Sequence, residues 1–265
     1  MLSGPFRFLH YRASSSIPFK GGLSHMSNSI LITGHLAKIG RPELARIPVP
    51  TATATHKPVP HHEIVEALIE TLGFRHIGVV GEEYAVSSDG MKMFGVIDLE
   101  SQMEGCRFSI GLRNSHDKSF RLALTVGYRV FVCSNMAFSG DFTPVLAKHS
   151  KSFNLIDTLA VGVDRIQRNF EPLQRQIEGW RQTQLTDDRA KLILYEAFVE
   201  GELDAPRGLL PEVHRLYFDP QYPEFAARSM WSLSNAFTSA FKTLDPIPQF
   251  KATAKLGAFL QKLQA

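Results

Sequence analysis

RFSIGLRNSHDKSFRLALTVGYRVFV, residues 107–132, decides the fold of this chain, because apolar side chains occupy every second position on both sides of a polar segment. Successive residues of a strand point to opposite faces of a sheet. This period of two predicts two β-strands, at residues 107–113 and 120–132, whose shared apolar face belongs to the core. The polar segment between them, around residues 115–118, predicts the turn that joins them.

A second pair of strands precedes the first. Residues 75–86 and 91–99 are rich in Val, Ile, Tyr and Phe, and the sequence SSDG at residues 87–90 between them is a hairpin signal. No helical pattern separates these runs, so we expect four antiparallel strands in a meander. An amphipathic segment at residues 61–73 predicts a helix ahead of the strands.

The C-terminal half has helical periodicity. From Leu155 to Trp180, eight apolar residues follow one another at spacings of three and four, and Pro172 interrupts the pattern where the helix should kink or restart. This stripe either packs on the sheet or forms a seam with another chain. Further helices are expected after an N-cap at Thr186, near 209–217, at 224–244 and, weakly, at 252–263. Strands in one block and helices in the next predict an α+β fold, with the helical half packed on one face of the four-stranded sheet.

Charge and composition divide the chain into regions. Residues 1–60 hold seven basic residues and one acidic residue, although the net charge of the whole chain is only +3. The first 25 residues fit either a transit peptide or a translation start placed too early, with Met26 as the true start. We expect a basic, flexible arm at 1–46, one α+β domain at 47–245 and an extension with a weak helix at 246–265.

Composition also excludes several classes of protein. Hydrophobic residues make up 44% and charged residues 21%, which excludes a disordered chain and a collagen-like repeat. No run approaches 18 apolar residues, so no membrane span is expected. Two isolated cysteines, Cys106 and Cys133, favour a reducing, cytoplasmic location, and without a Cys/His cluster we expect no metal site. The chain has no glycine loop for phosphates, so we expect no nucleotide cofactor.

The polar face of the two clearest strands carries arginines between small residues. A short turn would place Arg113 opposite Arg121, and like charges in such positions cost about 0.2–1 kcal/mol unless an acid, a phosphate or water offsets them. This face is either solvated, with Asp98, Glu82 or Glu83 as partners, or it binds a polyanion. In the second case the phosphate-contacting residues are Arg107, Arg113, Lys118, Arg121 and Arg129, with Phe131 and Phe94 stacking on bases.

Two other groups of polar residues raise the question of catalysis. His116 and Asp117 lie in the expected turn, and a Cys–His–Asp set with Cys133 would suit nucleophilic chemistry. A strand of about 13 residues, some 40 Å at about 3.3 Å each, separates His116 from Cys133 and argues against that pair. Polar residues of this kind more often stabilise a turn. Trp231 and Asn235 share one face of a helix, where Asn235 either bridges elements of the core or reaches a ligand.

These motifs resemble a known family. The stretch GLRNSHDKSFRLALTVGYRVFVCSNMAFSG, residues 111–140, resembles the core motif of a phage- and plasmid-associated family of domains of unknown function. The resemblance covers residues 47–245, and the order of helix, antiparallel strands and helices is also similar to that of Rad52-type single-strand annealing proteins. The residues that carry the family motif are Asn114, Ser115, His116, Asp117, Arg129, Cys133 and Asn135, with Trp231 and Asn235 in the helix MWSLSNAFTSAF.

The resemblance implies a protein of a mobile element and fixes no activity. Together with the arginine face, it leads us to expect a nucleic-acid-binding protein that prefers single-stranded DNA, acts in annealing or recombination and forms a homo-oligomer. One alternative is an enzyme on a small or phosphorylated substrate with His116 and Asp117 at its site, which a deep pocket of perturbed titrating groups would favour. The other is an assembly protein whose interface is the stripe at 155–180, which an exposed apolar seam would favour.

Overall fold

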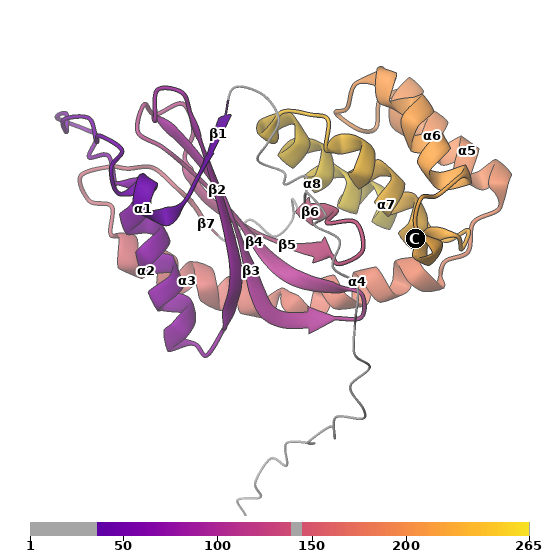
Figure 1. Cartoon of the computed structure of the whole chain (residues 1–265), viewed down its shortest axis with the longest axis horizontal. Coiled ribbons are helices and arrows are strands. Elements are labelled where there is room, and N and C mark those ends of the chain that lie inside the picture. The colour runs from indigo at the N-terminus through magenta and orange to yellow at the C-terminus, as the bar shows by residue number, and fades with distance from the viewer. Residues whose placement is uncertain (1–35, 139–144, 265) are drawn as a thin grey trace, which may run out of the picture.

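A computed structural model of the chain describes residues 36–138 and 145–264 (Figure 1). One antiparallel sheet forms its centre, in the order β1-β2-β3-β4-β5-β6, and β7 also pairs with β5. Figure 1 shows α2, α3 and α4 along one side of the sheet, α7 and α8 near β6, and α5 and α6 beyond them, away from the sheet. The strands are β1 (Leu36–Ile39), β2 (Val79–Ser87), β3 (Lys92–Met103), β4 (Cys106–Ser115), β5 (Leu122–Val130), β6 (Met136–Phe138) and β7 (Val145–Ala147).

The expected antiparallel strands correspond to β2, β3, β4 and β5, but the described sheet has seven strands rather than four. The three additional strands are only three or four residues long, which is too short to show an alternating pattern. Two of them share the outer edge of β5, where β6 pairs with Gly127–Arg129 and β7 with Leu122–Leu124. β5 therefore has partners on both edges, which explains why it is buried along its whole length.

The helical half follows the sheet, as the sequence predicts. The helices of the structure are α1 (Arg41–Leu44), α2 (His61–Phe74), α3 (Leu155–Arg168), α4 (Phe170–Gln182), α5 (Asp187–Tyr195), α6 (Leu210–Phe218), α7 (Met230–Phe241) and α8 (Pro246–Lys262). A π-helical turn at Glu196–Glu200 extends α5 as far as Gly201, whose φ of 84° ends the helix. Thr186 caps α5 through a side-chain oxygen that accepts the N–H of Arg189, as expected.

The apolar stripe at 155–180 forms two helices that meet at Asn169. Pro172 lies in the first turn of α4, where the backbone N–H that proline lacks would have no partner within the helix. The stripe residues Leu159, Val163, Ile166, Leu173, Ile177 and Trp180 are all buried in the main core. Each contributes about 1.5–3 kcal/mol relative to an exposed position. The stripe therefore packs within the monomer, and the described part of the chain leaves no exposed seam along it.

The second face of the sheet is filled by side chains. A Cβ atom added at Gly111 or at Gly127 would lie 2.7 Å from the ring of Phe138, so both glycines make room for that ring. Phe138 in turn packs against Phe250 of α8, with 5.6 Å between the ring centroids. The small residues between the arginines thus accommodate an aromatic side chain of β6, at a place that the sequence had left open to solvent or to a polyanion.

The chain ends differ in detail from the expected regions. Residues 36–44, which we had assigned to the basic arm, form β1 and α1, and β1 pairs with β2. Residues 1–25, and with them the expected leader or misplaced start, lie outside the described residues. The weak helix of the C-terminal extension is α8, which buries Ala252, Leu256 and Leu260. Among the described helices, none combines the length and the apolar character that a bilayer-spanning segment needs.

Candidate functional site

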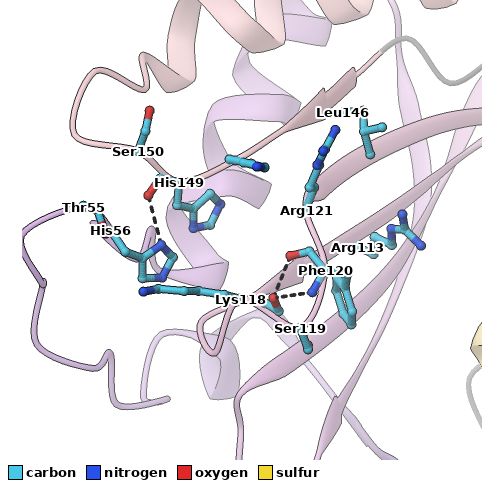
Figure 2. Close-up of a pocket in the computed structure, with 12 residues that line it drawn as sticks. Thr55, His56, Arg113, Lys118, Ser119, Phe120, Arg121, Leu146, His149 and Ser150 are labelled. Atoms are coloured by element: carbon cyan, nitrogen blue, oxygen red, sulfur yellow. Dashed lines mark hydrogen bonds between the residues drawn. The ribbon is translucent and has the colours of Figure 1, made fainter.

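A cavity of about 610 Å³ lies where three segments meet: the loop between β4 and β5, the segment that follows β7, and the extended segment before α2 (Figure 2). Figure 2 shows Thr55 and His56 on one side of it and Arg113, Phe120 and Arg121 on the other. Its volume is typical of sites that bind small ligands. The twelve lining residues are Thr55, His56, Arg113, Ser115, Lys118, Ser119, Phe120, Arg121, Leu146, Lys148, His149 and Ser150.

The lining of this cavity is strongly basic. Among the residues that the structure describes, it contains four cationic side chains and no acidic residue. None of the four, Arg113, Lys118, Arg121 and Lys148, forms an ion pair within 4.0 Å of a residue that the structure describes. Lys118, Arg121 and Lys148 are exposed, while Arg113 is half-buried. Unpaired cations around a concave surface produce a positive potential that attracts anions.

Arg113 is held between two aromatic rings. Its guanidinium carbon lies 5.4 Å from the ring centroid of Phe120 and 5.7 Å from that of Phe250. Burial lowers the pKa of the Arg113 guanidinium, because the charged form loses its hydration. Its Nε atom is buried and has no hydrogen-bond acceptor among the described residues. A buried donor left unpaired costs about 1–3 kcal/mol, so Arg113 is a candidate ligand-binding group.

Histidines form the opposite wall. The two ring nitrogens of His56 each lie 3.0 Å from a backbone carbonyl oxygen, Nδ1 from that of His149 and Nε2 from that of His116. The backbone N–H of Val59 donates to Nδ1 of His149 at 3.3 Å. Burial and the neighbouring rings of His56 and His116 lower the pKa of His149 to about 4, so the ring is neutral at pH 7. Its Nε2 is buried and has no partner among the described residues.

A second histidine pair lies behind this wall. The rings of His61 and His116 stack with 3.8 Å between their centroids, and burial, together with the charge that His116 carries when protonated, lowers the pKa of His61 to about 4. Asn114 donates from Nδ2 to Nδ1 of His61 at 2.8 Å and to the Val59 carbonyl at 3.2 Å. His116 contacts the same carbonyl through Nε2 at 3.1 Å. The histidines and Asn114 thus fasten the extended segment 51–60 to the sheet.

The loop that carries Lys118, Phe120 and Arg121 is shaped by the motif residues. The hydroxyl of Ser115 donates to the Phe120 carbonyl at 2.8 Å and accepts the Phe120 N–H at 3.2 Å (Figure 2). The carboxylate of Asp117 accepts the N–H of Ser119 at 2.9 Å. These bonds hold Lys118 at a φ of 64°, in the left-handed region that a lysine seldom adopts.

His116 and Asp117 therefore have structural roles in this fold. His116 is buried, stacked and bonded to the backbone, and it does not line the cavity. Asp117 is exposed and stabilises the turn. The enzyme alternative would need His116 and Asp117 to titrate together at one pocket. These two residues do not form such a pair.

The structure separates the seven residues expected to contact nucleic acid, and Phe94 lies beside the cavity residue Phe120 without lining the cavity itself. Arg113, Lys118 and Arg121 line the cavity, whereas Arg107, Arg129 and Phe131 lie elsewhere. The expected pairing of Arg113 with Arg121 is wrong: Arg113 lies opposite Ala123, and Arg107 lies opposite Arg129, because β5 begins at Leu122 after a longer loop.

The like charges of the Arg107–Arg129 pair are offset by acids. Arg129 is buried and forms ion pairs with Glu83 at 3.1 Å and Asp98 at 2.9 Å. Arg107 lies 4.9 Å from the ring centroid of Phe131, which follows the end of β5 and is exposed. The sequence had left open a solvated face with acidic partners and an anion-binding face. For Arg129 the expected partners are confirmed, since Glu83 and Asp98 neutralise it, but the pair is buried in the sheet and not solvated.

The two distant motifs of the sequence meet in the core. Asn135 donates from Nδ2 to the carbonyl of Asn235 at 3.0 Å and to its side-chain oxygen at 3.2 Å. Asn235 donates to the carbonyl of Trp231, and the ring of Trp231 packs on Tyr128 at 5.6 Å. These residues join α7 to the end of β5. Burial raises the pKa of the Cys133 thiol, which disfavours its nucleophilic thiolate.

Half of the lining residues carried no signal in the sequence. Thr55 and His56 lie in a proline-rich stretch, and Leu146, Lys148, His149 and Ser150 lie in and directly after the short strand β7, where the sequence has no periodic pattern. Within residues 36–138 and 145–264, no three His, Cys, Asp or Glu side chains are arranged to hold a metal ion. Both free cysteines, Cys106 and Cys133, are at least half-buried.

Comparison with known proteins gives one match. Residues 51–254 fit the model of the family described as Domain of unknown function (DUF932). The chain belongs to this family. The matched span of the DUF932 domain contains every lining residue of the cavity and both motif segments. No curated protein and no solved structure matches the chain.

Proposed function

We propose that this DUF932 protein binds single-stranded nucleic acid through the basic cavity, with single-stranded DNA as the favoured partner. The observation that carries the proposal is the lining, in which four unpaired cations and no described acid surround one concave surface. Cationic side chains bind phosphates and release the counterions that the phosphates had held, which supplies most of the affinity that does not depend on sequence.

The shape and the aromatic content of the cavity favour a single strand. A volume of about 610 Å³ accommodates groups of nucleotide size, whereas a duplex would touch only the rim. Phe120 lines the cavity and remains half-exposed, and an aromatic ring that stacks on a base contributes about 1–3 kcal/mol. Phosphate contacts and one stacking ring together are typical of proteins that bind single strands without reading their sequence.

Two resemblances support a role in strand annealing or recombination: one to phage- and plasmid-borne domains and one, in topology, to Rad52-type annealing proteins. We include in the proposal a cytoplasmic, homo-oligomeric protein of a mobile element. Annealing of complementary strands by the purified protein, compared with spontaneous annealing, tests this part separately from binding.

The binding proposal is tested with fluorescent oligothymidylate across a salt series. The variant Arg121→Ala/Lys148→Ala removes two exposed cations from the cavity. The control Arg175→Ala/Lys191→Ala removes the same charge from α4 and α5, outside the cavity, at side chains that are 68% and 57% exposed. Each phosphate contact contributes about 0.7 to the slope of log affinity against log salt, so the slope should fall by about 1.4 in the cavity variant and stay unchanged in the control.

Two results would refute the proposal. One is the absence of binding at low salt by folded, full-length protein. The other is an equal loss of affinity in the cavity variant and the control, which would show that only net charge matters.

A further inference from the structure

We propose that the cavity recognises a phosphomonoester, the phosphate group at the end of a nucleic-acid strand, in preference to the phosphodiesters along it. This inference rests on the proposed nucleic-acid function and names the group that enters the cavity. Three features of the described residues support it: two buried donors, an excess of cations and one closed side.

The first feature is a pair of buried N–H groups that have no acceptor among the described residues, both on residues that line the cavity. One is Nε of Arg113, which can only donate. The other is Nε2 of His149, whose ring is only 5% exposed. Because the N–H of Val59 donates to Nδ1 of His149, the proton of the neutral ring lies on Nε2. Buried donors almost always have an acceptor, so both groups point to a ligand with several acceptor oxygens.

The second feature is the charge of the lining. Four cations with no described acid in the cavity and no described ion-pair partner are well suited to a ligand of more than one negative charge. A phosphomonoester carries a charge of about −1.5 to −2 at neutral pH and presents three strong acceptor oxygens. An internal phosphodiester carries a single charge and has only two free oxygens. The group at a strand end therefore satisfies more of the donors and cations than an internal group does.

The third feature is the geometry of the wall. Contacts of 3.0 Å between the two ring nitrogens of His56 and the carbonyl oxygens of His149 and His116 join the segment after β7 to the loop between β4 and β5. Figure 2 shows the contact of His56 with the His149 carbonyl along one side of the cavity, with Arg113 and Arg121 opposite. A nucleic-acid strand that enters toward His149 meets this wall. An internal phosphate would need room for the chain to continue beyond it, whereas a terminal phosphate does not.

The experiment compares three fluorescent oligothymidylates: one with a 5′-phosphate, one with a 3′-phosphate and one with hydroxyl groups at both ends. Thymidine 5′-monophosphate serves as a competitor that distinguishes a free nucleotide from a strand end. We expect one phosphorylated strand to bind at least about tenfold more tightly than the unphosphorylated one. We also expect Arg121→Ala/Lys148→Ala to reduce this preference and Arg175→Ala/Lys191→Ala to retain it.

The variant Arg113→Lys isolates the buried donor, because lysine keeps the positive charge and lacks the planar guanidinium with its Nε–H. With an unchanged thermal unfolding midpoint, this variant should lose affinity for the phosphorylated strand by a larger factor than for the unphosphorylated one, so that the preference disappears. If Arg113→Lys does not fold, the affinities of the three oligothymidylates for the wild-type protein and for Arg121→Ala/Lys148→Ala still test the inference.

The outcomes separate this inference from the proposed function. Equal affinity for all three strands overturns the terminal-phosphate inference and leaves single-strand binding intact. A preference for the phosphorylated strand that survives in Arg113→Lys has the same consequence. Failure of the folded protein to bind any strand overturns the proposed function as well. If the mononucleotide competes as strongly as a phosphorylated strand does, the ligand is a phosphomonoester of a free nucleotide. That result overturns the inference that the phosphate belongs to the end of a strand.

Discussion

Acidification should destabilise this protein because two of its buried histidines are neutral in the folded state. The pKa values of His61 and His149 are lowered from 6.5 to about 4. The unfolded chain binds protons on these rings at a higher pH than the folded chain does. Their contribution to stability is therefore complete above pH 6.5 and is lost as the pH falls toward 4.

The magnitude follows from the shift. A change of about 2.5 pKa units corresponds to about 3.4 kcal/mol for each ring once the loss is complete, at about 1.36 kcal/mol per unit. Most of the change occurs early: between pH 7 and pH 5 each ring should lower the free energy of unfolding by about 2 kcal/mol. A charge on His149 also lowers the pKa of His61, so the contributions of the two rings are not independent. Their sum, about 4 kcal/mol, is therefore the largest loss of the free energy of unfolding that we expect between pH 7 and pH 5.

Urea unfolding at pH 7, 6 and 5, followed by the fluorescence of the buried Trp180 and Trp231, measures this loss. The variant His149→Asn places a non-titrating amide oxygen where it can accept the N–H of Val59, and it should lose about half of the pH dependence. The control His214→Gln changes an exposed ring on α6, which is not among the groups that lower the pKa of His61 or His149, and should leave the pH dependence as in the wild type. The reasoning fails if the free energy of unfolding changes by less than about 1 kcal/mol between pH 7 and pH 5, or if His149→Asn responds to pH as the wild type does.

Three other predictions concern packing and thiol chemistry. Gly127→Ala should destabilise the protein by about 1–3 kcal/mol in urea unfolding, because an added Cβ meets the backbone and an aromatic ring of β6. The control Gly73→Ala adds a Cβ where nothing lies within 4 Å and should stabilise α2 by about 0.5–1 kcal/mol. Equal effects of the two substitutions would contradict the packing described for β6. A double-mutant cycle on Asn135→Ala and Asn235→Ala should give a coupling energy of about 0.5–3 kcal/mol, and additive losses would show that their hydrogen bonds contribute nothing. Burial raises the pKa of the Cys106 thiol to about 11, so Cys106 should react with a thiol reagent at pH 8 only after urea is added. Rapid labelling of Cys106 in the native protein would contradict its burial.

Much of the fold could be predicted because the relevant patterns are local. The alternation at 107–132 reflects the period of a strand, and the spacing from Leu155 to Trp180 reflects that of a helix, so each can be recognised without knowing its partner. β1, β6 and β7 were missed because three or four residues show no period, and they form only where a longer strand offers its edge. The Arg113–Arg121 register was wrong for a related reason, since a turn of uncertain length shifts every pair after it.

The candidate site was only half visible for the same physical reason. Arg113, Lys118 and Arg121 lie in the strand and loop that the sequence singled out, so three of the four cavity cations were already in the predicted set. Lys148 and His149 reach them only because β7 pairs with the start of β5, a contact that no local pattern announces.

By itself the sequence determined the α+β class, the long strands, the helical C-terminal half and the arginines of one loop, because backbone geometry and amphipathic spacing act between near neighbours. Only the tertiary structure decided which arginines are free. It neutralised Arg129 with two acids inside the sheet, filled the space between the arginines with Phe138, and left Arg113 unpaired beside a cavity. Those outcomes depend on contacts between residues far apart in the chain, such as the 93 positions between His56 and His149, and such contacts are set by how the whole core packs.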